Sequence, residues 1–115
     1  MPDAVGEFTG VGNNFRGTFN VGGLQAQLFG KFDKYLPTFF VHNAIITYNS
    51  LRDFSGRYLI EPPPPPSFVG EETVDIWFTN LETGTKLHLT GNVVPPLDRR
   101  YLVVGDGLWV VRGDD

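Results

Sequence analysis

Histidine, acidic and hydroxyl side chains are the groups of this chain that could do chemistry, and histidines are few. His42 and His88 are the only two, and cysteine is absent. An oxygen-activating metal site needs two or three histidines and a carboxylate from neighbouring strands, so both histidines with Asp75 or Glu82 could supply part of one. His88, however, lies in phase with polar neighbours, as on a solvated strand face. We therefore expect no metal and no cofactor.

Nucleophilic and phosphate chemistry are not indicated either. No Gly-X-Ser-X-Gly elbow occurs, and Ser50, Ser55 and Ser67 lie in turn-like sequence, where serine hydroxyls bond locally. The segment GVGNNFRG has glycines but lacks the lysine and the following helix of a phosphate-binding loop. The acidic residues mostly resemble solvated loop charges. The sequence favours a protein without catalytic activity and leaves the enzyme question undecided.

Length and charge restrict the remaining possibilities. The chain has 115 residues, enough for one domain over residues 1–115, and a net charge of −4. Its nine basic residues are scattered, so we expect no nucleic-acid partner. No apolar run is long enough for a membrane span, and residues 1–9 do not resemble a signal peptide. We expect a cytoplasmic or virion-associated protein rather than a secreted one.

The elements that must position these side chains are all expected to be strands. Turn residues recur at short intervals between runs rich in β-branched and aromatic residues, a pattern typical of all-β proteins. The expected strands are Val5–Thr9, Phe15–Asn20, Leu24–Phe32, Thr38–Tyr48, Gly56–Ile60, Thr73–Thr79, Thr85–Val94, Tyr101–Val104 and Leu108–Arg112. Eight or nine mostly antiparallel strands with no secure helix predict a β-sandwich or a small β-barrel.

Glycines and turn dipeptides are expected to connect these strands. Gly10–Asn14 and Val21–Gly23 should join the first three strands, and a short loop containing Gly84 should form a hairpin. Asp106-Gly107 predicts a further hairpin with a type I′ turn. Gly-X-Phe occurs three times near the N-terminus, and aromatic rings beside strand glycines can pack over the bare backbone.

Two short motifs could bind partners, but a simpler interpretation is favoured for both. Glu61–Ser67, EPPPPPS, should form a polyproline II rod of the kind that aromatic grooves bind. Its place between two strands, without flanking Arg or Lys, favours a stiff surface connection instead. Arg112-Gly113-Asp114 matches the tripeptide that integrins read, and we interpret it as a coincidence.

Several strands carry apolar side chains on both faces. In Thr38–Tyr48, TFFVHNAIITY, a period of two places large apolar residues on either side. The two C-terminal strands do the same, and Trp77 interrupts an otherwise polar face. No helix is expected that could cover a second face. Long loops, a ligand inside a barrel or another subunit must therefore cover it.

A second subunit is the favoured cover. Exposed aromatic residues would leave roughly several hundred Å² of apolar surface, the size of patch that marks binding sites. The residues assigned to this interface or ligand-binding surface are Phe40, Ile46, Tyr48, Trp77, Trp109 and Val111. The sequence thus predicts a non-catalytic, self-associating interaction or structural module, a homo-oligomer or a component of a larger, viral-type assembly.

Two alternatives belong to other classes. A carbohydrate-binding β-sandwich would use Trp77 or Tyr48 as an aromatic platform, with directional hydrogen bonds from Asn43, Asp75 and Thr79. A small β-barrel would instead enclose an apolar small molecule, and could cyclise it by proximity rather than with a triad.

Overall fold

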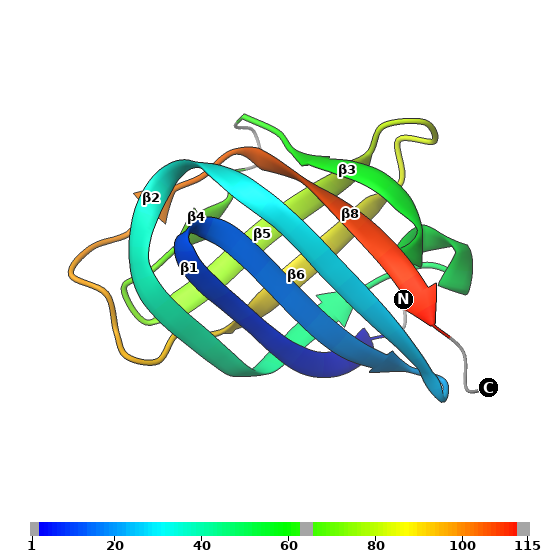
Figure 1. The fold of residues 1–115 in the computed structure, drawn as a ribbon, viewed down its shortest axis with the longest axis horizontal. Coiled ribbons are helices and arrows are strands. Elements are labelled where there is room, and N and C mark those ends of the chain that lie inside the picture. The colour runs from blue at the N-terminus through cyan, green and yellow to red at the C-terminus, as the bar shows by residue number, and fades with distance from the viewer. Residues whose placement is uncertain (1–2, 63–65, 113–115) are drawn as a thin grey trace.

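The computed structural model describes residues 3–62 and 66–112, which form strands joined by turns (Figure 1). The elements are β1 (Asp3–Val21), β2 (Leu24–Thr47), the 3₁₀ turn η1 (Leu51–Phe54), β3 (Gly56–Ile60), β4 (Phe68–Val69), β5 (Thr73–Asn80), β6 (Lys86–Asn92), β7 (Tyr101–Leu102) and β8 (Gly105–Arg112). None of these residues is α-helical. Within these two ranges no helix has the length and apolar character needed to cross a membrane.

Five antiparallel strands close into a barrel, and three more extend it. The ring runs β2, β8, β3, β5 and β6. It closes on β2 because the two halves of β2 pair with different strands. Residues 25–32 of β2 pair with β8, whereas residues 45–47 pair with β6. The predicted all-β class is confirmed, and pairing between distant segments selects the barrel over the sandwich.

The first two strands are long and double back as nested arches (Figure 1). β1 combines two predicted strands, because the segment Gly10–Asn14 bends within a strand, with register shifts at Gly12, instead of ending one. β2 likewise combines Leu24–Phe32 with most of Thr38–Tyr48. Both halves of β1 pair with β2, so each arch supports the other.

A β-bulge in β2 explains why its C-terminal half seemed apolar on both faces. Phe8 pairs with Val41, and Gly6 pairs with Ala44. His42 and Asn43 of β2 therefore oppose the single β1 residue that lies between Gly6 and Phe8. One extra residue reverses the inward and outward phase of everything beyond it. The buried side chains are therefore Phe39, Val41, Ala44 and Ile46, one continuous inner face. Strict alternation was the wrong assumption here.

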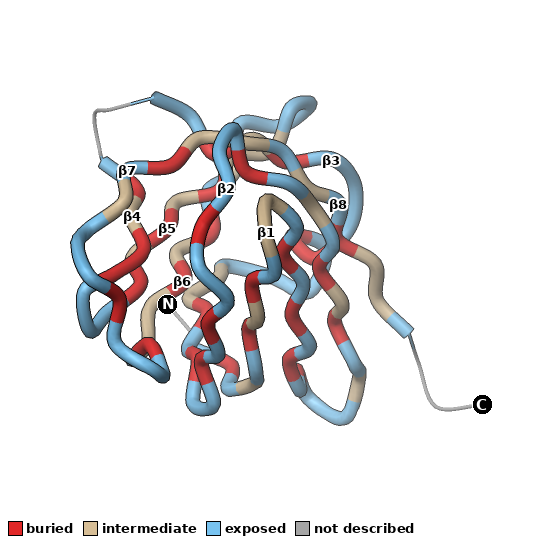
Figure 2. Tube along the Cα trace, turned by 60° about the vertical axis from the view of Figure 1, so that its left-hand side comes forward, coloured by how far each residue is buried: buried red, intermediate tan, exposed pale blue. Residues whose placement is uncertain are grey.

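The barrel interior is filled with aromatic side chains, and burial alternates along the strands (Figure 2). The Phe15 ring lies 4.6 Å from Phe32 and 6.1 Å from Phe78, measured between ring centroids. Trp109 lies 5.1 Å from Phe54 and 5.7 Å from Phe19 by the same measure. These rings join β1, β2, η1, β5 and β8 into one core.

Inward-facing glycines make room for those rings. A Cβ atom at Gly30 would lie 2.5 Å from Phe15 Cζ, and one at Gly10 would overlap the ring of Phe39. The predicted packing of aromatic residues over glycine backbone is confirmed at Gly30. Gly10, which was expected in a connection between strands, lies inside β1 and is covered in the same way. This packing allows strands of a narrow barrel to approach rings that a side chain would otherwise displace.

The turns agree in part with the predictions. β5 and β6 form the expected hairpin, with Gly84 in its loop at a φ of 76°. The predicted hairpin at Asp106-Gly107 is wrong, because both residues lie inside β8 and pair with β2. β7 pairs with β4 rather than with β8. Residues 63–65, at the centre of the proline run, and the last two residues of the Arg112-Gly113-Asp114 tripeptide lie outside the described residues.

The turn η1 is held by a buried network around Asp53 and Tyr58. The Asp53 carboxylate accepts the amides of Asn49 at 2.8 Å and Ser50 at 3.0 Å, and the Tyr58 hydroxyl donates to the Asp53 carbonyl oxygen. Burial raises the pKa of the Tyr58 hydroxyl above its ordinary value, and the charge of Asp53 raises it further, against a lowering by a hydrogen bond with Asn80. The fold therefore favours the neutral phenol.

Gly6→Ala should destabilise the barrel strongly. A Cβ at this position would overlap the Thr18 carbonyl oxygen and lie 2.7 Å from Phe19 Cα, both backbone atoms that cannot rotate away. Urea denaturation should show a loss of about 3 kcal/mol in the free energy of unfolding. Gly107→Ala is the matched control, because its nearest neighbours would be 3.2 Å away; about 1 kcal/mol is expected. Equal losses would contradict the nested-arch packing.

Alkaline pH should destabilise the protein through Tyr58. Its pKa is raised in the folded state, so its stabilising contribution is complete below the unfolded value of about 10 and is lost as pH rises through the folded value. Denaturation at pH 8 to 11 should show a steeper fall in unfolding free energy for the wild type than for Tyr58→Phe. Tyr35→Phe, which removes an exposed hydroxyl, should keep the wild-type slope.

Candidate functional site

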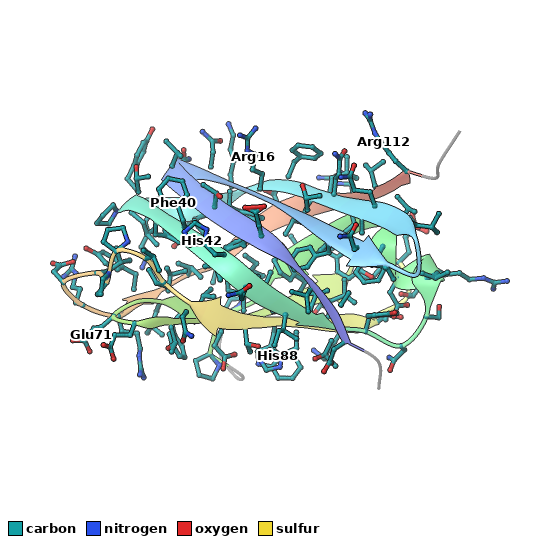
Figure 3. The ribbon with its side chains drawn as sticks, turned by 90° about the horizontal axis from the view of Figure 1, so that it is seen from below. Arg16, Phe40, His42, Glu71, His88 and Arg112 are labelled. Carbon is teal, nitrogen blue, oxygen red and sulfur yellow. The ribbon has the colours of Figure 1, made fainter. Side chains whose placement is uncertain are left out.

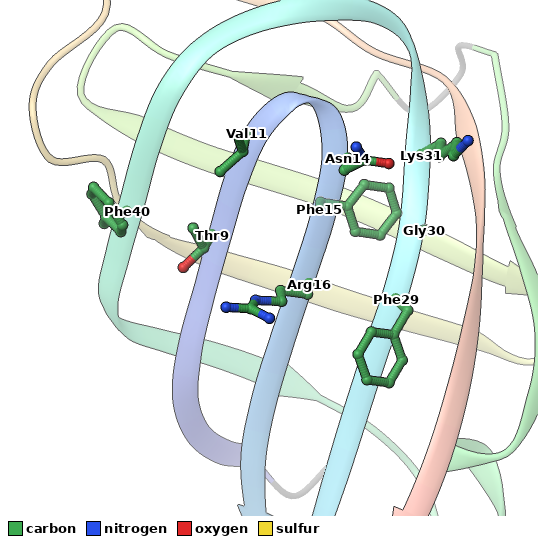
Figure 4. A pocket seen from close by; sticks show the side chains of 9 residues that line it. All are labelled: Thr9, Val11, Asn14, Phe15, Arg16, Phe29, Gly30, Lys31 and Phe40. Atoms are coloured by element: carbon green, nitrogen blue, oxygen red, sulfur yellow. The ribbon is translucent and has the colours of Figure 1, made fainter.

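Exposed apolar side chains gather over the two arches and line a pocket of about 640 Å³ (Figure 4). Val11 is 56 % exposed, Phe29 47 % and Phe40 43 %. The complete lining is Thr9, Val11, Asn14, Phe15, Arg16, Phe29, Gly30, Lys31 and Phe40. Its volume falls in the range of small-molecule and peptide-binding pockets.

The pleat of β1 and β2 and one glycine create this pocket. Leu28 and Phe32 point into the core, so Phe29 and Lys31 between them point outward. Gly30 adds no side chain, and the Phe15 ring packs against its backbone from below. The pocket thus has a rigid aromatic floor.

Two neighbouring depressions continue the pocket across the sheet. One is about 250 Å³ and shares Phe29 and Gly30 with the pocket, then extends over Leu108 to Arg57. The other is about 270 Å³ and shares Thr9, Arg16 and Phe29. Leu108 is directly opposite Phe29 and is 44 % exposed, so the apolar surface is continuous from β2 to β8. We call this surface the outer face; it comprises Val11, Arg16, Phe29, Lys31, Arg57, Phe40 and Leu108.

The pocket is basic although the chain as a whole is acidic. Arg16 and Lys31 are the only charged residues in its lining, and both are exposed. In Figure 4 the Arg16 side chain lies between Phe40 and Phe29. Within residues 3–62 and 66–112 neither cation forms an ion pair, although Asp106 faces Lys31 across the strands. An occupant with apolar and acidic groups would suit this pocket.

Of the six residues assigned to an interface, Phe40 alone lies on the outer face. Ile46 and Trp109 are core residues, 0 % and 1 % exposed, and their assignment to a surface is corrected. The bulge turns Ile46 inward, and barrel closure places Trp109 among Phe19, Phe54 and Phe78. A charged substitution of Trp109 would therefore disrupt the core and not test an interface.

The other three assigned residues lie elsewhere. Tyr48 and Val111 are partly buried and pack against the core, Tyr48 with its ring 4.8 Å from that of Phe54. Trp77 is partly exposed on the outside of β5. None of the three lines the pocket, so the predicted set does not form one surface.

Trp77 belongs to a second, polar cluster on the outside of β5 and β6. Its ring is parallel to that of His88, with centroids 3.8 Å apart, and His88 Nε2 is 2.7 Å from an Asp75 carboxylate oxygen. Thr79 follows on the same face of β5, whereas Asn43 lies in the β2 bulge. His88 and Arg16 project from opposite sides of the barrel (Figure 3).

The two histidines have different neighbours, so the structure does not combine them. His42 stacks on Phe40, with ring centroids 6.2 Å apart, whereas His88 contacts Trp77 and Asp75. Among the described side chains, no three of the metal-ligating types come together.

Most residues of the outer face were not predicted from the sequence. Val11, Phe29, Leu108 and both pocket cations were not selected. A signal was present in Leu28-Phe29-Gly30-Lys31, because a strand that buries Leu28 must expose Phe29 and Lys31 together.

Comparisons with protein-family models, with curated proteins and with solved structures find no match for this chain. The function must therefore be argued from the outer face and the Trp77 cluster themselves.

Proposed function

We propose that this protein is a non-catalytic interaction module that self-associates through its outer face, as a structural component of a larger assembly. One observation carries the proposal: the exposed apolar side chains of Val11, Phe29 and Phe40 line one pocket, and Leu108 extends this surface from Phe29 onto β8. Apolar patches of this kind mark interaction sites.

The filled interior favours an external site. Phe15, Phe19, Phe78 and Trp109 contact other rings across the barrel and occupy the space that an enclosed ligand would need. The remaining apolar binding surface is outside. This supports association over the alternative of a small molecule held or cyclised within the barrel.

The size of the apolar surface predicts association of moderate strength. Fully burying one such side chain contributes about 1.5–3 kcal/mol. Val11, Phe29 and Phe40 are about half exposed, so covering them contributes on the order of 4 kcal/mol before association costs. Micromolar binding requires about 8 kcal/mol after those costs are subtracted, so these side chains alone are insufficient, and Leu108, polar contacts and the apolar groups of the second copy must supply the rest. We expect a dissociation constant in the micromolar range or weaker.

Phe29→Asp should weaken self-association at least about tenfold, because it places a desolvated charge at the centre of the contact. Size-exclusion chromatography with light scattering measures the shift from dimer to monomer. The protein concentration should run from about 1 to roughly 200 µM, a range that includes micromolar dissociation constants. Leu102→Asp is the matched control: Leu102 is similarly exposed, but on β7 outside the outer face. A monomeric wild type, or equal weakening by both variants, would refute the proposal.

Saccharide binding is the second candidate, and the Trp77 cluster favours it. Trp77 offers an aromatic ring beside the oriented Asp75–His88 pair and the hydroxyl of Thr79. Aromatic platforms with a few directional polar groups are suited to sugar rings. The cluster lies outside the core, so it is not needed to fill the barrel.

A glycan array should detect this activity, and a bound sugar should change tryptophan fluorescence. Trp77→Ala should abolish both signals, and Asp75→Asn should weaken binding by about 1–2 kcal/mol through loss of a charged hydrogen bond. Phe29→Asp should leave sugar binding unchanged, because it alters the other side of the barrel. An array without a hit argues against this candidate alone.

A further inference from the structure

We propose that the outer-face pocket of one copy binds the β5–β6 turn of a second copy, through Leu81 and Glu82. This inference rests on the proposed self-association and names the segment that fills the pocket. It assigns the pocket an occupant with both an apolar and an acidic group.

The β5–β6 turn is exposed and preorganised. Leu81 is 50 % exposed, and Glu82 next to it is exposed as well. The side-chain oxygen of Asn80 accepts the amides of Glu82 at 2.8 Å and Thr83 at 3.0 Å, and the Gly84 amide donates to the Asn80 carbonyl at 3.0 Å. A turn held in this way loses little conformational entropy on binding.

The chemistry of the turn complements that of the pocket. Leu81 can cover Phe29 and Phe40, while the Glu82 carboxylate can approach Arg16 and Lys31, which form no ion pair in the described part of the chain. Aliphatic and acidic groups are adjacent in the turn, as the aromatic and basic groups are in the pocket. Charge complementarity of this kind sets register and partner choice.

The positions of the turn and the pocket permit reciprocal docking. The Leu81 amide donates to the Arg57 carbonyl at 3.1 Å, and Arg57 forms the far edge of the depression that begins at Phe29. The β5–β6 turn therefore lies at the end of the outer face that is next to β3. The arches that line the pocket lie at the opposite end of this face (Figure 1). A two-fold axis between them brings each turn to the other copy's pocket. Two-fold dimers are the commonest oligomers.

A charge exchange between two variants tests the inference. E82R and R16E alter exposed side chains, so both should fold, as circular dichroism can check. In E82R the turn and the pocket are both positive, and in R16E the Glu82 carboxylate meets a second carboxylate in place of the Arg16 guanidinium, with Lys31 as the remaining pocket cation. Dimerisation of either variant alone should therefore weaken at least about tenfold. In an equimolar mixture, the turn of either variant meets the opposite charge in the other's pocket, and light scattering should again detect a dimer.

The outcomes distinguish this inference from the proposed function. If the wild type dimerises and Phe29→Asp prevents it, but E82R dimerises normally or the mixture remains monomeric, the outer face is the interface and the turn is not its occupant. A wild type that is monomeric at high concentration refutes both. Restored dimerisation in the mixture, with neither variant dimeric alone, supports the inference.

Discussion

The contact of aromatic rings with bare glycine backbone is the constraint on which the structure depends. Phe15 packs under Gly30, Phe39 under Gly10, and Phe19 beside Gly6, so the arches of β1 and β2 can follow the surface of a narrow, filled barrel. A methyl group at any of these glycines would meet a ring or a neighbouring strand. Close packing of the core therefore depends on these pairs of residues, one large and one without a side chain, as well as on hydrophobic burial.

The same constraint produces the outside of the molecule. Because Gly30 has no side chain, the Phe15 ring packs against its backbone, and the outward-pointing residues Phe29 and Lys31 on either side of Gly30 stand around a hollow. The register of β2 with β8 then places Leu108 beside Phe29 and extends the apolar surface. An acidic chain thus presents one basic and aromatic pocket, which gives the outer face a chemical identity distinct from the Trp77 cluster on the other side.

Fold class and several local features could be predicted from the sequence because they depend on near neighbours. Strand-forming runs, the β5–β6 hairpin and the outward position of Asp75 all follow from propensity and alternation. The prediction of a turn at Asp106-Gly107 was wrong because the same dipeptide can lie within a strand when two neighbouring strands pair with it. The prediction of an interface position was wrong for Ile46 because one bulge reverses the inward and outward phase of β2. It was wrong for Trp109 because a second apolar face was assumed to need a partner, whereas the core buries this side chain.

The sequence by itself determined that this chain forms strands and which strands alternate inward and outward residues. It also indicated that no helix is expected. Tertiary structure alone decided that the sheet closes, which apolar face turns inward and where the exposed remainder gathers. The physical reason is the range of the interactions. Strand formation depends on a few adjacent residues, whereas closure and facing depend on pairing between segments such as residues 25–32 and β8, which lie far apart along the chain.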